Sequence, residues 1–251
     1  MKTLTLQPSD IHTGSLLLIN AQHPLIPGFT VHDCVPVSER HQEVRLASTP
    51  AILFTQLMQA LSAQEQIVPV SGFRPHGEQC AIWDDCMQQH GEAFTRKFVA
   101  RPGCSEHESG LALDVAQGGG PIDFLCPKFP YTGICQSFRQ MAPRFGFVER
   151  YPRGKESETG IGHEPWHFRY VGTPHARIMQ RYDLTLEGYI DFLREFPYPR
   201  HPYRICERQE ILSVGFVPVP AVGTQVQLHA VPYQLSGNNV DGVIITTWEP
   251  M

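Results

Sequence analysis

The stretch 105–114, which reads SEHESGLALD, constrains the fold of this chain more than any other. It leads into an apolar run, 111–116, with glycines on both sides, so we predict a buried strand that begins after a loop. In such a strand Asp114 shares a face with the small side chains of Ala112 and Ala116. An isolated aspartate is costly to bury among apolar residues. A divalent cation next to Asp114 would offset this cost.

A second segment, 164–167, reads EPWH and begins another strand-like run. Glu164 and His167 are three residues apart, so in a regular strand their side chains would point to opposite faces. For both to face one metal ion, the backbone must be irregular between them, and we predict this irregularity. His107 precedes the first strand, in a loop from which it can curl back toward Asp114.

Together the two segments offer two imidazoles, one carboxylate ligand and one spare carboxylate. A catalytic zinc site uses the same inventory: three protein ligands, a fourth position for water, and a base that takes the proton from this water. A single histidine in a chain that has twelve is more often a surface residue or a hydrogen-bonded core residue. The joint pattern is therefore what predicts the site, and within it His163 competes with His167 as the second imidazole.

The order of these residues resembles a known family. Ser-x-His-x-x-Gly-x-Ala-x-Asp followed by Glu-x-Trp-His is similar to the signature of the zinc D-alanyl-D-alanine carboxypeptidases and dipeptidases, the VanY, VanX and VanXY group of metallopeptidases. The segment 71–79, SGFRPHGEQ, resembles the family's Ser-Gly-Tyr-Arg-Ser…Gln, with Phe73 in place of Tyr and Pro75 in place of Ser. The segment 16–25 resembles the family's first strand, and the likeness runs from about residue 12 to about residue 175.

This resemblance implies a role for each residue of the site. The implied ligands of Zn²⁺ are His107, Asp114 and His167. Glu164 is the implied general base, whereas the neighbouring acids Glu106 and Glu108 receive no role. Arg74 is implied to bind the substrate, because a planar guanidinium suits both a terminal carboxylate and a developing oxyanion, and the resemblance does not choose between the two. Gln79 and Ser105 match positions that hydrogen-bond the substrate, although a loop cap is an alternative for Ser105.

The implied activity is that of a zinc D,D-peptidase, most similar to the bifunctional VanXY type. Its substrates would be small peptides that end in D-Ala-D-Ala: the dipeptide, the peptidoglycan-precursor pentapeptide, or both, with a role in glycopeptide (vancomycin) resistance. One rival is an L,D-carboxypeptidase or an endolysin-like L-Ala-D-Glu endopeptidase with related zinc chemistry. A second rival is a zinc-binding module without catalysis, against which the spare carboxylate of Glu164 argues, because a structural zinc site needs no base.

Periodicity and turn signals predict an α+β fold. A mixed, mainly antiparallel sheet flanked by helices would hold the zinc site in a central cleft of a catalytic domain, 1–183, followed by a small appended β-rich unit, 184–251. Residues 117–133 are expected to form an irregular loop beside the site, either a binding wall or a surface excursion. The expected strands are 16–19, 67–70, 111–116, 146–148, 164–171, 224–228 and 243–247, and the expected helices are 48–64, 77–98, 134–145, 174–181 and 186–196.

Composition excludes several classes of partner. A net charge of −5 without a basic cluster gives no attraction to nucleic acid. No run approaches the roughly 20 apolar residues of a membrane span, and the N-terminus does not read as a signal peptide. Seven cysteines, an odd number without a Cys-x-x-Cys pair, favour reduced thiols and a cytoplasmic location. Nothing in the sequence favours a particular oligomeric state.

Overall fold

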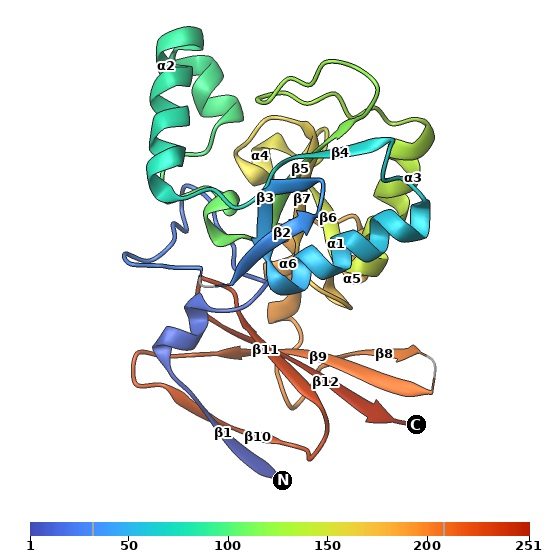
Figure 1. Cartoon of the computed structure of the whole chain (residues 1–251). Helices are drawn as coiled ribbons and strands as arrows, with labels where there is room; N and C mark the ends of the chain where they lie inside the picture. The colour runs from blue at the N-terminus through green and yellow to red at the C-terminus, as the bar shows by residue number, and fades with distance from the viewer. Residues whose placement is uncertain (32, 208) are drawn as a thin grey trace. The chain divides into compact units, whose positions relative to one another are not determined.

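The computed structural model describes residues 1–31, 33–207 and 209–251. Its contacts divide the chain into two compact units, one formed by Ile19–Thr185 and the other by Met1–Leu18 together with Leu186–Met251 (Figure 1). The expected division into domains 1–183 and 184–251 stays a prediction; by contacts, the first eighteen residues group with the C-terminal segment.

A four-stranded sheet organises the unit Ile19–Thr185. Its strands, in order, are β4 (Ile67–Ser71), β5 (Ala112–Gln117), β7 (Glu164–Tyr170) and β6 (Phe147–Tyr151). Each neighbouring pair is antiparallel. A hairpin of β2 (Cys34–Ser38) and β3 (His41–Ala47) forms a separate two-stranded sheet. The predicted α+β class with a mainly antiparallel sheet is confirmed.

The helices of this unit agree with the predicted ones to within a few residues, apart from the unpredicted short α4. They are α1 (Ser48–Leu61), α2 (His76–Phe98), α3 (Gly133–Met141), α4 (Glu156–Thr159) and α5 (His175–Tyr182), with 3₁₀ helices at Glu106–Ser109 and Ala142–Phe145. α1 forms because Ala51, Phe54 and Met58 recur at the spacing of one helical face, which is buried. α2 is kinked at Gly91, where φ is 77°, a conformation that glycine adopts at little cost.

The two faces of the four-stranded sheet differ in character. One face carries Leu113 and Val115 of β5 and Phe168 of β7, all fully buried in one apolar cluster with side chains of α1 and α3. The rings of Phe138 and Phe168 lie 4.9 Å apart in this cluster, nearly perpendicular to each other. The opposite face carries the buried charged residues described below. Because side chains alternate along a strand, apolar and charged residues follow one another in β5 and β7 and are separated by the sheet.

The strand predicted at 16–19 is wrong. Leu16 and Ile19 are fully buried, as the apolar run suggested, but the segment has no strand geometry. The Leu16 N–H donates to the Ser236 hydroxyl at 2.8 Å, and the Leu18 N–H donates to the Asn238 carbonyl at 3.0 Å. Single hydrogen bonds to β11 and to the residue just after it therefore satisfy this backbone, where a strand would need a ladder.

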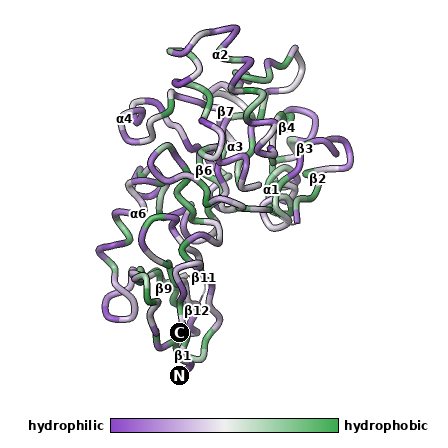
Figure 2. Tube along the Cα trace, turned by 90° about the vertical axis from the view of Figure 1, so that its left-hand side faces the viewer, coloured by the Kyte–Doolittle hydropathy of each residue, from purple (hydrophilic) through white to green (hydrophobic). Residues whose placement is uncertain are grey.

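The second unit is rich in β-structure, as predicted. It has a four-stranded sheet, β11 (Tyr233–Gly237), β12 (Gly242–Pro250), β9 (Glu210–Pro218) and β8 (Tyr203–Glu207), a pair of β1 (Lys2–Leu6) with β10 (Thr224–Leu228), the helix α6 (Leu186–Arg194) and a 3₁₀ helix at Pro8–His12. Its apolar core includes Leu6 of β1 and Leu228 of β10 as well as Val243 and Ile245 of β12. Figure 2 shows the hydrophobic segments along these strands.

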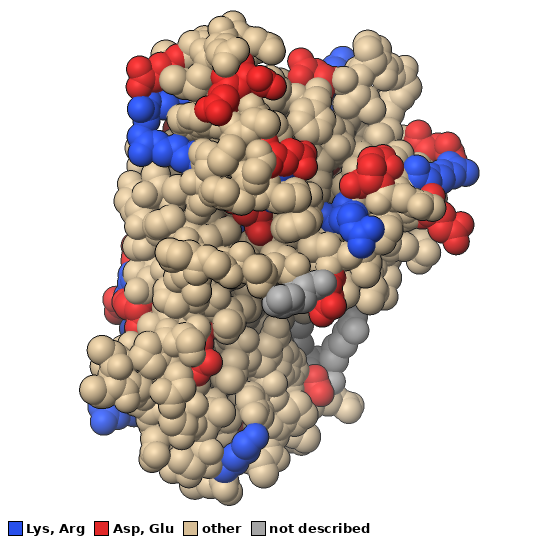
Figure 3. Space-filling model, turned by 60° about the vertical axis from the view of Figure 1, so that its left-hand side comes forward, with Lys and Arg blue, Asp and Glu red and all other residues tan. Residues whose placement is uncertain are grey.

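On the face drawn in Figure 3, acidic and basic residues are interspersed rather than gathered into one patch of either sign. Among the helices that the structure describes, none combines the length and the apolar character that crossing a membrane requires.

Candidate active site

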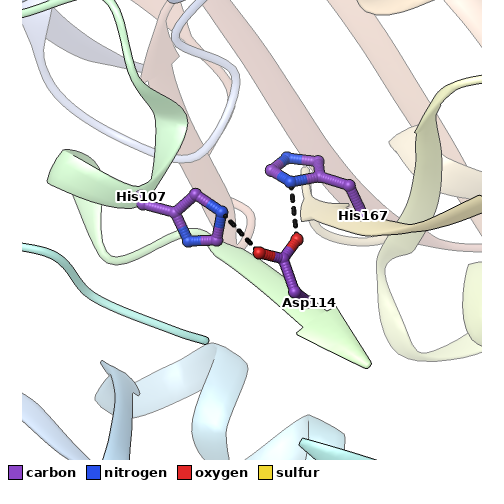
Figure 4. Close-up of side chains that lie close together, drawn as sticks. All are labelled: His107, Asp114 and His167. Atoms are coloured by element: carbon purple, nitrogen blue, oxygen red, sulfur yellow. Dashed lines mark hydrogen bonds and ion pairs between the residues drawn. The ribbon is translucent and has the colours of Figure 1, made fainter. Parts of the chain in front are cut away.

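The three predicted ligand residues lie together on the charged face of the sheet (Figure 4). Asp114 of β5 pairs directly with His167 of β7 across the antiparallel ladder, so the two side chains share one face. His107 reaches them from the 3₁₀ helix Glu106–Ser109. The Asp114 carboxylate lies 3.1 Å from His107 Nε2 and 2.9 Å from His167 Nδ1. One ligand atom from each residue lies within 4.8 Å of the other two, and all three residues are buried.

The predicted irregularity in the second motif is confirmed. Glu149 of β6 pairs with Phe168, and Tyr151 pairs with Glu164, so two steps along β6 match four steps along β7. The extra residues of β7 form a bulge between Glu164 and Phe168. As a result Glu164 Oε2 lies 3.9 Å from His167 Nδ1, on the same side of the sheet, although the two residues are three apart.

The donor set fits a divalent metal ion. His107 Nδ1 lies 2.7 Å from the Gly72 carbonyl, so its Nε2 faces Asp114. Position 72 has to be glycine, because a Cβ there would meet the Arg45 carbonyl oxygen at 2.2 Å. His167 Nε2 lies 3.4 Å from Glu106 Oε2, so its Nδ1 faces Asp114. Two imidazole nitrogens and one carboxylate therefore converge, each imidazole held from behind by an acceptor, as in known zinc sites.

Electrostatics within the cluster point the same way. Burial alone would raise the pKa of Asp114, but the charge of His107 and hydrogen bonds to both imidazoles hold this pKa well below its usual range. Burial would lower the pKa of His167, but hydrogen bonds to Asp114 and Glu106 raise it to about 10. The electrostatics of the cluster thus favour positive charge at the place where the three ligand atoms meet.

Glu164 is the spare carboxylate that the motif predicts. It is buried and lines the same small cavity, of about 50 Å³, as the three ligand residues. Burial, reinforced by the charge of Asp114, raises its pKa to about 8, against the opposing effects of His167 and Arg74. A carboxyl group with a pKa near neutrality can both accept and release a proton at physiological pH.

Arg74 lines this cavity, while Gln79 supports it from behind. The Arg74 guanidinium donates from Nη1 to Gln79 Oε1 at 2.8 Å and from Nη2 to Ser71 Oγ at 2.9 Å. Its buried Nε has no hydrogen-bond partner within the described part of the chain. Gln79 also donates to the Ala100 carbonyl at 2.7 Å and does not line the cavity, whereas Ser105 does. Sequence reasoning treated Gln79 and Ser105 alike, but the structure places only Ser105 at the cavity wall.

The loop that follows β5 contributes one wall of the cavity. No helix or strand lies within 118–132, as predicted. Phe124 and Leu125 of this loop line the cavity, and the Phe124 ring centre lies 6.0 Å from the Arg74 guanidinium. Arg139 of α3 holds the far end of the loop, because it donates to the Phe129 carbonyl at 2.6 Å and to the Pro165 carbonyl, next to Glu164, at 2.7 Å.

Three buried charged residues beside the three predicted ligand residues received no role from the sequence. Glu106 Oε1 accepts hydrogen bonds from Arg150 Nε at 2.7 Å and from Arg169 Nη1 at 2.8 Å, and all three side chains are inaccessible to solvent. Burial would raise the pKa of Glu106, but the two arginines hold it well below its usual range. The available signal was an arginine within each of two apolar strand segments, β6 and β7.

Comparisons with known proteins agree with this geometry. A family model described as VanY, D-alanyl-D-alanine carboxypeptidase, matches residues 43–173. The chain belongs to this family. It is 38% identical over 183 residues to the bifunctional D-Ala-D-Ala dipeptidase and D-Ala-D-Ala carboxypeptidase VanXYC of Enterococcus gallinarum, an alignment that covers 72% of this chain and 96% of that protein. The family resemblance inferred from the motifs is thereby confirmed.

Two solved structures of the VanY and VanXY type extend the comparison. The crystal structure of the vancomycin resistance D,D-dipeptidase VanXYg, in complex with a D-Ala-D-Ala phosphinate analogue, matches with a TM-score of 0.95 and 41% identity over 99% of both chains, the C-terminal unit included. A mutant of the vancomycin resistance D,D-pentapeptidase VanY, in complex with Zn(II), matches with a TM-score of 0.60 and 30% identity over 70% of this chain and 98% of that one.

Proposed function

We propose that this chain is a zinc-dependent D,D-peptidase. Its substrates would be D-Ala-D-Ala and the terminal D-Ala of peptidoglycan-precursor pentapeptides, and it would act in the cytoplasm in glycopeptide resistance. The observation that carries the proposal is the convergence of His107, Asp114, His167 and Glu164 on one buried cavity. The bifunctional activity named for VanXYC and the full-length similarity to VanXYg support the choice of substrates.

The proposed metal site consists of His107 Nε2, His167 Nδ1 and the Asp114 carboxylate. Zn²⁺ bound there would act as a Lewis acid toward the scissile carbonyl. Glu164, at the edge of the same cavity, would accept the proton of the attacking water and pass it to the amine of the departing D-alanine. Its raised pKa, about 8, supports this two-way role.

Arg74 is proposed to bind an anionic group of the substrate. Gln79 and Ser71 hold its two terminal nitrogens, so the guanidinium is fixed in one orientation before substrate arrives. Its buried Nε can donate to the terminal carboxylate or to the oxyanion that forms during hydrolysis. Ser105 can add a hydroxyl donor from the cavity wall. Gln79 would then contribute to substrate binding indirectly, by holding Arg74 in place.

The direct test is D-alanine release from D-Ala-D-Ala and, in parallel, from a UDP-linked pentapeptide, each with and without a chelator. We expect chelator-sensitive release from both substrates. Release from neither, together with cleavage of a tetrapeptide that ends in a single D-Ala, would replace the proposal by the L,D-carboxypeptidase alternative. Fractionation of the host cell would test the cytoplasmic location.

Glu164→Gln tests the role of the base. We expect kcat to fall about 10²–10⁴-fold, the usual range for a general base. Zinc binding should be retained, because Glu164 is not one of the three proposed ligands. Glu156→Gln, a fully exposed carboxylate on α4, is the matched control and should leave kcat unchanged. Unaltered turnover in Glu164→Gln would overturn the assignment of the base.

A further inference from the structure

Glu106 stands between the metal ligands and two buried arginines. It opens the 3₁₀ helix Glu106–Ser109, one residue before the ligand His107, and its side chain is inaccessible to solvent. Oε1 accepts hydrogen bonds from Arg150 and Arg169, at 2.7 and 2.8 Å. Oε2 lies 3.4 Å from Nε2 of the ligand His167. One carboxylate therefore contacts both guanidinium groups and one metal ligand.

The strand pattern brings these groups together. Arg169 lies two residues after His167 on β7, so both side chains emerge on the same face of the sheet. Arg150 comes from the neighbouring strand β6. Buried arginines keep their charge, so each requires an anionic or hydrogen-bonding partner within the protein. Glu106 places a negative charge in contact with both arginines and with the proposed ligand His167.

The contact with Glu106 also constrains the imidazole of His167. A carboxylate accepts a hydrogen bond, so the hydrogen of the metal-bound ring belongs on Nε2, and Nδ1 keeps its lone pair for the metal. His107 is held the other way, since the Gly72 carbonyl takes its Nδ1 hydrogen and leaves Nε2 for the metal. The two imidazole ligands are thus fixed in opposite tautomers, one by a buried carboxylate and one by a backbone carbonyl.

We propose that Glu106 is a positioning residue for the metal centre, which fixes the orientation and tautomer of His167 and shields it from the charges of Arg150 and Arg169. This inference rests on the proposed zinc site but not on the proposed substrate. Its consequence is a higher affinity for zinc. Removing an outer partner of a metal ligand typically weakens metal binding by about 10–100-fold.

Glu106→Gln tests this role, with Glu108→Gln as the matched control. Glu108 is a second buried carboxylate of the same 3₁₀ helix, but it contacts the Gly103 N–H and His76 Nδ1, each at 2.7 Å, away from the ligands. Zinc affinity is measured by competition with a chromophoric chelator, which requires no substrate. We expect the affinity of Glu106→Gln to fall about 10–100-fold and that of Glu108→Gln to change less than about twofold. Equal affinities in the two variants would overturn the proposal.

A second measurement needs no variant, in case Glu106→Gln does not fold. Wild-type protein with ¹⁵N-labelled histidine is loaded with zinc, and the ring nitrogens are read by NMR. We expect two metal-bound imidazoles of opposite tautomer, one with a slowly exchanging hydrogen on Nε2 and one with its hydrogen on Nδ1. Two metal-bound rings of the same tautomer would contradict the proposal. Failure of D,D-peptidase activity would leave both readouts intact, so the two hypotheses are tested separately.

Discussion

The two faces of the four-stranded sheet bury different kinds of side chain. Phe168 and Leu113 on one face pack in an apolar cluster, whereas their chain neighbours His167 and Asp114 lie on the other face among charged groups. Both faces are buried, the apolar one more completely. The apolar face requires only fitting volumes, because hydrophobic contacts have no direction. The charged face requires a specific partner for each group, because an unpaired buried charge costs several kcal/mol.

This contrast separates stability from function within one sheet. On the apolar face each large side chain contributes about 1.5–3 kcal/mol by leaving water. On the charged face the favourable pairing is largely offset by the loss of hydration, so the net gain is small. What the charged face provides is a set of groups at fixed positions. Variants on the two faces should therefore differ in how much unfolding free energy they lose and in whether the function of the site is retained.

A large loss of stability is expected from breaking a buried ion pair. Arg150→Met leaves Glu106 without one of its two guanidinium partners inside the protein. We expect a loss of about 3–5 kcal/mol in the free energy of unfolding, measured by urea denaturation. Arg153→Met, an exposed arginine three residues on, should change it by less than about 0.5 kcal/mol. If Arg150→Met lost as little unfolding free energy as Arg153→Met, the stability of the charged face would not depend on the pairing of its charges.

Buried histidines allow a test by pH. His175 of α5 is fully buried, and burial lowers its pKa to about 3, in contrast to His167. Because the folded-state pKa lies below the unfolded value of 6.5, protonation of His175 favours the unfolded state. The free energy of unfolding is therefore undiminished by His175 above pH 6.5 and decreases as the pH falls toward 3. Between pH 7 and pH 5 the expected loss from His175 is about 2 kcal/mol. The urea midpoint of His175→Gln should decline correspondingly less over this interval, and identical declines would refute the prediction.

Conservative exchange on the apolar face should be mild. Phe138 of α3 packs against Phe168 with ring centres 4.9 Å apart. Phe138→Leu retains an apolar side chain and should cost less than about 1.5 kcal/mol, with zinc binding unchanged. Phe138→Ala leaves a cavity and should cost about 3–5 kcal/mol. Calorimetry of the two variants measures how far the stability of this face depends on side-chain volume alone. Equal losses of unfolding free energy in Phe138→Leu and Phe138→Ala would mean that side-chain shape matters as well as volume.

The smallest effect on stability is expected at the cavity wall. Phe124 is 47% exposed in the loop after β5 and lies over Arg74. Phe124→Ala should change the free energy of unfolding by less than about 0.5 kcal/mol. KM should nevertheless change for the pentapeptide, the dipeptide or both, because the side chain lines the cavity. Steady-state kinetics on both substrates would detect this, and two unchanged KM values would exclude the loop as a binding wall.

The sequence predicts well what is encoded locally. The helix α1, the buried run of β5 and the spacing of the zinc motifs each lie within a short window, and all three appear as expected. The bulge at Glu164 could be predicted because a chemical requirement conflicted with regular strand geometry. The site residues named in advance, apart from Gln79, all face the cavity.

The remaining features depend on long-range pairing, which leaves no local pattern. Glu106 meets Arg150 and Arg169 across 44 and 63 residues of chain, and the apolar neighbours of the two arginines suggested only strands. The segment 16–19 has the composition of a strand, but it meets the end of β11 through isolated hydrogen bonds and forms no ladder among the described residues. Composition indicates burial in each case, but only the tertiary fold decides which partner a backbone or a charge acquires.

The pairing of β1 with β10 has a consequence for biosynthesis. Lys2 lies opposite Leu228, so β1 leaves the ribosome long before its partner strand β10 and has to wait for it. At a translation rate of about 5–20 residues per second, this delay is roughly 10–45 seconds. The complete segment Ile19–Thr185 emerges within that time. The residues of the proposed metal site can therefore reach their final arrangement while β1 is still unpaired, and β1 pairs with β10 only afterwards.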